Sequence, residues 1–182
     1  MSHSSPKKIV VTGGLGFIGS HTVVELQQQG FEVIIIDDLS NSSKEVLNGI
    51  FAITHQSPTF AEIDLKDKKA VAAFFSNHSD IAGIIHFAAY KAVGESVEKP
   101  LQYYQNNLVG LLKVLSLMEE FKVLNFVFSS SCTVYGQAEK MPITEDASVQ
   151  PAISPYGNTK QIGEEIINDV AIACAYAIMG KN

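Results

Sequence analysis

The sequence predicts an α/β fold in which helices cover both faces of a parallel sheet, and three observations support this. Short β-branched runs alternate with longer segments of helical periodicity. The run at residues 31–38, FEVIIIDD, is almost continuously apolar, which is typical of a strand buried on both faces. Glycine, proline and polar residues separate the segments. Because crossovers between parallel strands are right-handed, we expect a doubly wound sheet.

The expected elements follow in order along the chain. Each strand is a short apolar run next to turn residues, at residues 7–14, 31–38, 58–64, 81–89 and 123–131. The helices lie between or after these runs, at residues 16–30, after the polar turn 39–43 as far as Phe51, at 65–78, at 100–121 and onward from Ser154-Pro155. Gly30 suits a helix end, and Pro100 suits a first helical position, where its missing N–H is tolerated. A loop with Pro142 and Pro151 precedes the last helix.

The composition indicates a globular chain and argues against two classes of partner. The 182 residues are 46% hydrophobic and 18% charged, and the formal net charge is −6. This charge argues against nucleic acid and anionic membranes as partners. The first residues, MSHSSPKK, show no apolar signal core, and no apolar run is long enough to span a bilayer. The two cysteines have no metal or disulfide spacing, so we expect no metal and a cytoplasmic location.

Four glycines stand between the first strand and the first helix, in VTGGLGFIGS. Gly14, Gly16 and Gly19 fit G-x-G-x-x-G, whereas Gly13, Gly16 and Gly19 fit the variant G-x-x-G-x-x-G. Either pattern permits a tight turn, a close approach of the backbone to a pyrophosphate, and close packing of the helix on the strand. A glycine-rich turn without a ligand is the alternative. The flanking strand and helix favour a dinucleotide and a Rossmann-like domain.

Asp37 comes 18 positions after Gly19, at the end of the second strand. An acid at about this spacing accepts hydrogen bonds from the adenosine ribose, and its charge repels a 2′-phosphate. The residue therefore favours NAD over NADP. Asp38 competes for this role, and we prefer Asp37 because it directly follows the apolar run. A carboxylate that merely caps the turn is the alternative.

Hydroxyl groups gather at the end of the fifth strand, in FVFSSSCTVYG, at Ser129, Ser130, Ser131 and Thr133. Beside a cofactor such groups can hydrogen-bond a substrate oxygen, although they are also ordinary turn residues. Cys132 has no activating partner nearby in the sequence. We therefore expect it to be a small buried thiol rather than a nucleophile.

Tyr156 and Lys160 lie four positions apart in SPYGNTK, so on a helix they share one face. A free phenol has a pKa of about 10, which is too high for a base at neutral pH. A lysine one turn away and an oxidised nicotinamide ring would stabilise the phenolate and lower that pKa. The pair therefore predicts a general base, and a chance surface pair is the alternative.

With these motifs, the sequence resembles the extended short-chain dehydrogenase/reductase family and, within it, the nucleotide-sugar 4-epimerases. The resemblance is carried by VTGGLGFIGSHTVVEL, DDLSNS, HFAAYKAVGESVEKPLQYYQNN, FSSSCTVYG and SPYGNTK. The run KAVGESVEKPLQYYQNN is the most specific of them. The similarity extends from about Lys8 to about Val170.

The resemblance implies an isomerase of galactose metabolism that interconverts UDP-glucose and UDP-galactose through a 4-keto sugar, with NAD held tightly. Tyr156 would take the proton of the sugar 4-hydroxyl while NAD oxidises C4. Lys160 would bind the nicotinamide ribose, and Ser131 would hydrogen-bond the 4-oxygen. By the same analogy we expect a homodimer formed through the helix at 100–121 and the helix from Pro155.

The resemblance also implies a set of cofactor contacts. The glycines and the two residues after Gly16 would face the pyrophosphate, the stretch 37–42 the adenosine, and the pair 64–65 the adenine. The full set is Gly13, Gly16, Phe17, Ile18, Gly19, Asp37, Asp38, Leu39, Ser40, Asn41, Ser42, Asp64, Leu65, Phe87, Ala88, Ala89, Lys91, Asn106, Tyr156 and Lys160.

Two alternatives compete with this function. A dehydratase must eliminate water, and related dehydratases carry Asp-Glu where this chain has Cys132 and Thr133, which cannot supply that acid–base pair. An NAD-binding module without catalysis is the second alternative, because epimerases of this type are much longer. We therefore expect residues 1–182 to be one NAD-binding domain, the N-terminal part of an epimerase without its C-terminal substrate domain, with impaired turnover.

Overall fold

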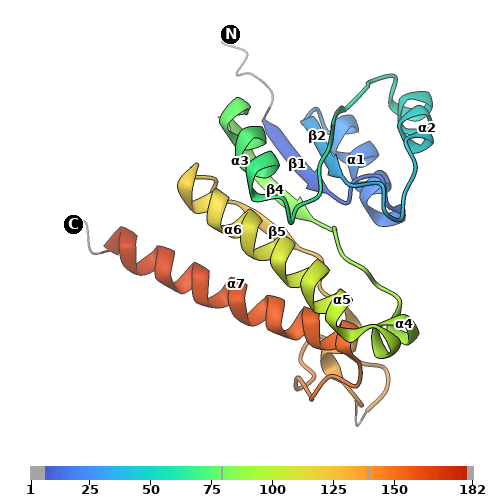
Figure 1. The fold of residues 1–182 in the computed structure, drawn as a ribbon, viewed down its shortest axis with the longest axis vertical. Coiled ribbons are helices and arrows are strands. Elements are labelled where there is room, and N and C mark those ends of the chain that lie inside the picture. The colour runs from blue at the N-terminus through green and yellow to red at the C-terminus, as the bar shows by residue number, and fades with distance from the viewer. Residues whose placement is uncertain (1–6, 79, 139, 180–182) are drawn as a thin grey trace. The chain divides into compact units, whose positions relative to one another are not determined.

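The computed structural model describes residues 7–78, 80–138 and 140–179, and Figure 1 shows the arrangement of its elements. The strands are β1 (Lys8–Thr12), β2 (Glu32–Asp37), β3 (Thr59–Glu62), β4 (Ile81–His86) and β5 (Phe126–Phe128). The α-helices are α1 (Phe17–Gln28), α2 (Glu45–Thr54), α3 (Lys68–Asn77), α4 (Val93–Glu98), α5 (Pro100–Tyr104), α6 (Gly110–Glu120) and α7 (Pro155–Met179). A π-helix, η1 (Gln105–Val109), and a 3-10 helix, η2 (Cys132–Tyr135), complete the described elements.

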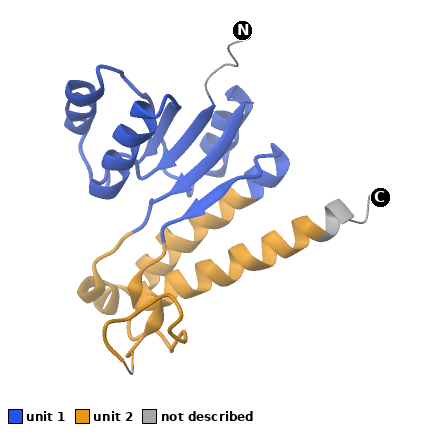
Figure 2. Ribbon diagram, turned by 180° about the vertical axis from the view of Figure 1, so that it is seen from behind, with its two compact units in different colours: residues 1–89, 116–129 blue, residues 90–115, 130–182 orange. Residues whose placement is uncertain are grey.

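The chain forms two compact units, which Figure 2 colours separately. Unit 1 comprises residues 1–89 and 116–129 and holds the sheet together with α1, α2 and α3. Unit 2 comprises residues 90–115 and 130–182 and holds α4, α5, η1, η2 and α7. Helix α6 begins in unit 2 and ends in unit 1.

The sheet of unit 1 is parallel throughout, with the strand order β3-β2-β1-β4-β5. The chain builds outward from β1 to β3 on one side and then returns to add β4 and β5 on the other side of β1. This order confirms the predicted doubly wound α/β fold. The order reverses between β1 and β4, and ligands of such sheets bind at that position, beyond the carboxyl ends of the strands.

Successive residues of a strand point to opposite faces of the sheet. Because successive residues of β2 are apolar, both faces must be covered, and helices lie on each. On one face, Val11 of β1 and Ile35 of β2 belong to the same buried cluster as Ile50 of α2. Helix α3 lies on the opposite face (Figure 1), where the ring of Phe75 packs against Phe121 with their centroids 5.6 Å apart. The apolar run of β2 is therefore buried on both sides, as the sequence predicts.

Unit 2 is built around the first half of α7, which packs against α4, α5, η1 and η2. Tyr103 of α5 is fully buried, and its hydroxyl donates a hydrogen bond of 2.8 Å to Oε2 of Glu95 in α4. Burial raises the pKa of Tyr103 to about 12, and the hydrogen bond to Glu95 adds to this effect. The neutral phenol thus fixes α4 to α5.

Several boundaries differ from the sequence predictions. Strand β5 has three residues rather than the nine expected at 123–131, and the helix expected at 100–121 contains the π-helical turn η1. Helix α4 was not expected, because six residues are too few to show a periodic pattern. Helix α3 begins at Lys68, later than expected, because the Asp67 carboxylate caps it by accepting hydrogen bonds from the N–H groups of Lys69 and Ala70.

Candidate active site

The cofactor contacts expected in unit 1 gather at one edge of the sheet. The glycine turn follows β1, Asp37 ends β2, Asp64 and Leu65 come soon after β3, and residues 87–89 follow β4. These four strands are neighbours in the order β3-β2-β1-β4. Because they are parallel, the loops at their carboxyl ends share an edge, which is where a dinucleotide binds in such a sheet.

The glycine turn after β1 has no room for side chains. Gly13 has a φ of +67°, and a Cβ added there would stand 2.7 Å from the backbone nitrogen of Ala88. A Cβ on Gly19 would stand 2.2 Å from the carbonyl oxygen of Gly13, so this glycine lets α1 pack closely on the turn. A Cβ on Gly14 would meet the side chain of Ile35 at 2.8 Å. A side chain at Gly13, Gly14 or Gly19 would therefore clash with neighbouring atoms. This accounts for glycine in both G-x-G-x-x-G and G-x-x-G-x-x-G.

Helix α1 begins directly after this turn with an accessible N-terminus. Gly16 is the N-cap, and among the described residues no side chain caps the first turn. The side chains of Phe17 and Ile18 are 78% and 58% exposed. The first N–H groups of a helix lack partners within the helix and carry its positive partial charge. Together with the glycine cradle, this end of α1 fits the pyrophosphate of a dinucleotide.

Asp37 is buried and holds two loops together. Its Oδ2 accepts a hydrogen bond of 3.0 Å from the N–H of Leu15 in the glycine turn. Its Oδ1 accepts from the N–H of Leu39 at 3.0 Å and from the hydroxyl of Ser42 at 2.7 Å. A carboxylate can accept about four hydrogen bonds, so Asp37 can organise these loops and still bind a ribose hydroxyl. The neighbouring Asp38 instead bonds locally to Ser40.

The other expected contacts of unit 1 differ in exposure. Leu65 is buried, whereas Asp64 is exposed and forms an ion pair of 2.9 Å with Lys66. Partial burial acts to raise the pKa of Asp64, but the N–H and ammonium groups of Lys66 outweigh it, so the pKa lies below its usual value. Ser40 and Asn41 are exposed, and residues 87–89 are half-buried.

In unit 2, the turn that carries Ser131 packs on the start of α7. The hydroxyl of Ser131 caps η2 by accepting hydrogen bonds from the N–H and the hydroxyl of Thr133, at 3.3 and 3.0 Å. A Cβ on Gly157 would stand 3.2 Å from the side chain of Thr133. The amide of Gln161 donates to the carbonyl oxygen of Val134 at 2.7 Å. The turn of Ser131 therefore lies against the helical turn that contains Tyr156.

The first turn of α7 is fixed from within unit 2 by Asn107, a residue that the sequence reading did not single out. The buried Asn107 donates to the hydroxyl of Thr159 at 3.0 Å, and that hydroxyl donates to the carbonyl oxygen of Tyr156 at 2.7 Å. Asn107 also exchanges two hydrogen bonds with the backbone of Tyr90. The sequence shows only the pair of asparagines 106–107, and nothing local distinguishes the second.

Lys160 is 4% exposed, although it is a lysine on a long helix. Burial lowers its pKa to about 8, and the charge of Glu164 partly opposes the shift. At pH 7 the ammonium form still predominates. An ammonium group one helical turn after Tyr156 can donate hydrogen bonds and can stabilise a nearby negative charge.

The remaining predicted site residues of unit 2 are less buried than Lys160. Lys91 is exposed, and Asn106 is half-buried with its amide donating to Oδ1 of Asn107 at 3.2 Å. Cys132 is exposed, so the prediction of a buried thiol is wrong. The reason is that β5 ends at Phe128, which places Cys132 in the short η2 helix instead of directly after a buried strand.

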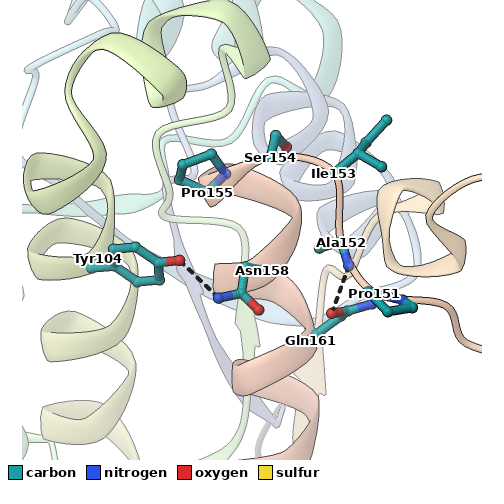
Figure 3. A pocket seen from close by; sticks show the side chains of 8 residues that line it. All are labelled: Tyr104, Pro151, Ala152, Ile153, Ser154, Pro155, Asn158 and Gln161. Atoms are coloured by element: carbon teal, nitrogen blue, oxygen red, sulfur yellow. Dashed lines mark hydrogen bonds between the residues drawn. The ribbon is translucent and has the colours of Figure 1, made fainter.

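A cavity of about 440 Å³ lies elsewhere in unit 2, and Figure 3 shows its lining. The lining residues are Tyr104, Pro151, Ala152, Ile153, Ser154, Pro155, Asn158 and Gln161. Across this lining, the side-chain amide of Asn158 donates a hydrogen bond of 2.7 Å to the hydroxyl of Tyr104 (Figure 3). Because an α-helix turns by 100° per residue, Asn158 and Gln161 point well away from the direction of Tyr156. None of the predicted site residues lines this cavity.

Within residues 7–78, 80–138 and 140–179, none of the helices combines the length and the apolarity needed to cross a bilayer. The same residues contain no group of three or more His, Cys, Asp or Glu side chains placed to hold a metal ion.

The comparison with protein families agrees with the motifs. A model of the NAD-dependent epimerase/dehydratase family matches residues 9–180. The chain belongs to this family. The epimerase/dehydratase family model thus includes both the glycine turn and the segment with Tyr156 and Lys160.

Relatives within the epimerase/dehydratase family are similar over most of this chain. A UDP-glucose 4-epimerase of Bacillus subtilis is 51% identical over 165 residues, which is 91% of this chain and 48% of the relative. A UDP-glucose 4-epimerase of Haemophilus influenzae is 48% identical, with the same coverage. The chain therefore spans about half the length of these relatives.

Solved structures of such epimerases have the same fold. UDP-glucose 4-epimerase from Bifidobacterium longum, in complex with NAD+ and UDP, superposes with a TM-score of 0.89 at 41% identity, covering 92% of this chain and 50% of that one. The enzyme from Stenotrophomonas maltophila, with bound NAD and formylated UDP-arabinopyranose, gives a TM-score of 0.87 at 44% identity, covering 92% and 49%.

Proposed function

We propose that the chain binds NAD at the sheet edge of unit 1. The supporting observations are the cradle of Gly13 and Gly19, the uncapped start of α1 and the buried carboxylate of Asp37. The similar structures from B. longum and S. maltophila contain NAD. We also propose that the rest of the expected contact set takes part, from the loops after β2, β3 and β4 together with Lys91, Asn106, Tyr156 and Lys160. The carboxylate of Asp37 would disfavour the 2′-phosphate of NADP.

We propose that the reaction is the interconversion of UDP-glucose and UDP-galactose through a 4-keto sugar. The observation that carries this proposal is the arrangement in unit 2, where the capped turn of Ser131 packs on the turn of α7 that bears Tyr156 and the buried Lys160. The 51% identity to the UDP-glucose 4-epimerase of B. subtilis supports the choice of substrate.

The roles of the side chains follow from their chemistry. Bound NAD supplies the oxidation and the later reduction of the sugar C4. Tyr156 accepts the proton of the 4-hydroxyl at its phenolic oxygen and returns it when the product forms. Ser131 keeps its own hydroxyl proton available for the sugar 4-oxygen, because its oxygen accepts the two bonds from Thr133. Lys160 provides a charged donor for a ribose hydroxyl and lies one turn from Tyr156.

A second candidate is an NAD-binding module that does not catalyse. One observation favours it: the chain spans about half the length of the relatives. We therefore propose that residues 1–182 by themselves bind NAD but convert UDP-sugars slowly or not at all. An assay of the purified chain for formation of UDP-glucose from UDP-galactose tests this, and turnover at the rate of a complete epimerase would contradict it.

The cofactor proposal is tested by titrating the purified chain with NAD and NADP under the same conditions. We expect binding of NAD and much weaker binding of NADP. In a full-length context, Tyr156→Phe should keep NAD bound and lower the rate by several orders of magnitude, because only the proton acceptor is lost. Loss of NAD binding in Tyr156→Phe would show that its role has been misassigned.

Partners and location complete the proposal. We propose a homodimer, since the helices expected to pair carry exposed apolar side chains, among them Leu101, Leu112 and Ile172, which are 74%, 45% and 47% exposed. Analytical ultracentrifugation tests this, and a monomer at high concentration would contradict it.

The net charge of −6 argues against nucleic acid as a partner. A cytoplasmic location stays a prediction from the sequence.

A further inference from the structure

Glu164 lies on α7 one helical turn after Lys160, and its carboxylate has a specific partner. The hydroxyl of Ser130 donates a hydrogen bond to Oε1 of Glu164. Ser130 directly precedes Ser131, the candidate partner of the sugar oxygen. Tyr156, Lys160 and Glu164 are spaced by four residues each, so they follow one another along one side of the helix. Glu164 thus connects the serine turn to the helix of the candidate base.

We propose that Glu164 is a positioning residue that keeps Lys160 charged in its buried place and holds the serine turn against α7. The proposal rests on the proposed function in so far as Ser131, Tyr156 and Lys160 are taken as the reacting set. Glu164 itself acts through these residues and does not contact the substrate.

The physical reason is the cost of burying an ammonium group. Lys160 is 4% exposed, and an enclosed ammonium group is costly unless it is paired and hydrogen-bonded. The charge of Glu164 acts on Lys160 in the direction that keeps the proton on it. A neutral Lys160 would lose the positive charge that favours a proton acceptor at Tyr156, so the carboxylate supports the chemistry from two turns away.

Other ionisable groups also lie around α7 within unit 2. On the elements that pack against α7, and on α7 itself, they are Glu95, Glu98, Lys99, Tyr103, Tyr104, Cys132, Tyr135, Tyr156, Glu165, Asp169 and Cys174. Glu95 is engaged by Lys99 at 2.9 Å and by the hydroxyl of Tyr103. Of Glu164 and these other groups, Glu164 is the one whose charge acts on the pKa of Lys160.

The substitution Glu164→Gln separates charge from shape. Glutamine keeps the length of the side chain and an oxygen that can accept from Ser130, but it removes the negative charge. Glu165→Gln is the matched control, because Glu165 is the exposed neighbour on the same helix. Lys160→Met removes the buried ammonium group and keeps an unbranched apolar chain of similar length.

The experiment measures urea unfolding of the whole chain at pH 7 and pH 10, without cofactor, for the native sequence, Glu164→Gln, Glu165→Gln, Lys160→Met and the double variant of residues 160 and 164. Below pH 8 folding must bury a charged Lys160, whereas at pH 10 the folded state holds it neutral. Glu164→Gln should therefore lower the folding equilibrium constant about fivefold more at pH 7 than at pH 10, which is the change expected when the pKa of Lys160 falls by about one unit from about 8.

The same excess at pH 7 should be absent from Glu165→Gln, and it should disappear when Glu164→Gln is made in the Lys160→Met background. An equal effect of Glu164→Gln at both pH values would overturn the proposal, because it would show a structural role that is independent of the lysine charge. If Glu164→Gln does not fold at either pH, the double variant decides. It folds if the buried positive charge of Lys160 is the cause, and its failure to fold also overturns the proposal.

Two further measurements test the claim that Glu164 holds the serine turn against α7. They also separate the positioning role of Glu164 from the proposed NAD binding and epimerisation. In a full-length context that supports turnover, Ser130→Ala should slow the UDP-sugar reaction through kcat more than through KM, with NAD binding unchanged. An unchanged kcat would overturn the claim that Glu164 holds the serine turn. The unfolding series needs neither NAD nor substrate, so it can succeed when NAD titration fails, and the two hypotheses are judged separately.

Discussion

The substitution Gly13→Ala tests how the first loop of unit 1 is built. Gly13 has a φ of +67°, and an alanine in this left-handed region costs about 1–2 kcal/mol. Its new Cβ would also stand 2.7 Å from the backbone nitrogen and 2.9 Å from the Cα of Ala88. These backbone atoms cannot rotate away as a side chain can, so overpacking adds about 1–3 kcal/mol. The loss of chain entropy in the unfolded state returns up to about 1 kcal/mol.

We therefore expect Gly13→Ala to lower the free energy of unfolding by about 1–5 kcal/mol. Urea unfolding followed by circular dichroism measures this as a lower midpoint at an unchanged slope. Two other glycines serve as controls. Gly30 has a φ of +86° with nothing within 4 Å of an added Cβ, so Gly30→Ala shows the cost of conformation alone. Gly49 lies open on α2, and Gly49→Ala should stabilise the chain by about 1 kcal/mol.

The difference between Gly13→Ala and Gly30→Ala measures the contact between the glycine turn and Ala88. If Gly13→Ala costs no more than Gly30→Ala, the close approach of the loops after β1 and β4 is wrong. The cradle argument for the pyrophosphate would fail with it.

Two other predictions concern a buried charge and a helix cap. The pKa of Lys160 is about 8 in the folded state and lies near its ordinary value of 10.5 when unfolded, so between these values the unfolded state binds more protons. The free energy of unfolding should therefore rise by up to about 3 kcal/mol from pH 8 to pH 10.5 relative to Lys160→Met, and equal slopes for the two proteins would refute this. Asp67→Ala should cost about 1 kcal/mol in urea unfolding because the N–H groups of Lys69 and Ala70 lose their acceptor, and an unchanged midpoint would speak against the cap.

Features that depend on near neighbours in the chain could be predicted well. The doubly wound sheet follows from the alternation of apolar runs and helical segments. The glycine turn and Asp37 are recognisable by spacing, because the geometry of a strand–turn–helix unit is set by the residues within it. The same spacing placed Asp37 at the carboxyl end of β2, where the structure has it.

Features that depend on distant residues could not be predicted. Asn107 fixes the first turn of α7 through hydrogen bonds with Tyr90 and Thr159, which lie 17 and 52 positions away in the chain. Glu164 shows a helical spacing to Lys160, which is a usable signal, but its bond to Ser130 joins segments 34 positions apart. The exposure of Cys132 follows from where β5 ends, and strand ends are set by pairing with a neighbouring strand.

The amino-acid order alone thus determined the alternation of strands and helices that gives the doubly wound sheet, the position of the glycine turn, and the helical spacing that puts Tyr156 and Lys160 on one face. Tertiary structure decided that Lys160 is buried, which lowers its pKa to about 8, and that Asp37 ties two loops together. The reason is physical: periodicity is a property of adjacent residues, whereas desolvation and hydrogen-bond partners depend on atoms that folding brings in from elsewhere in the chain.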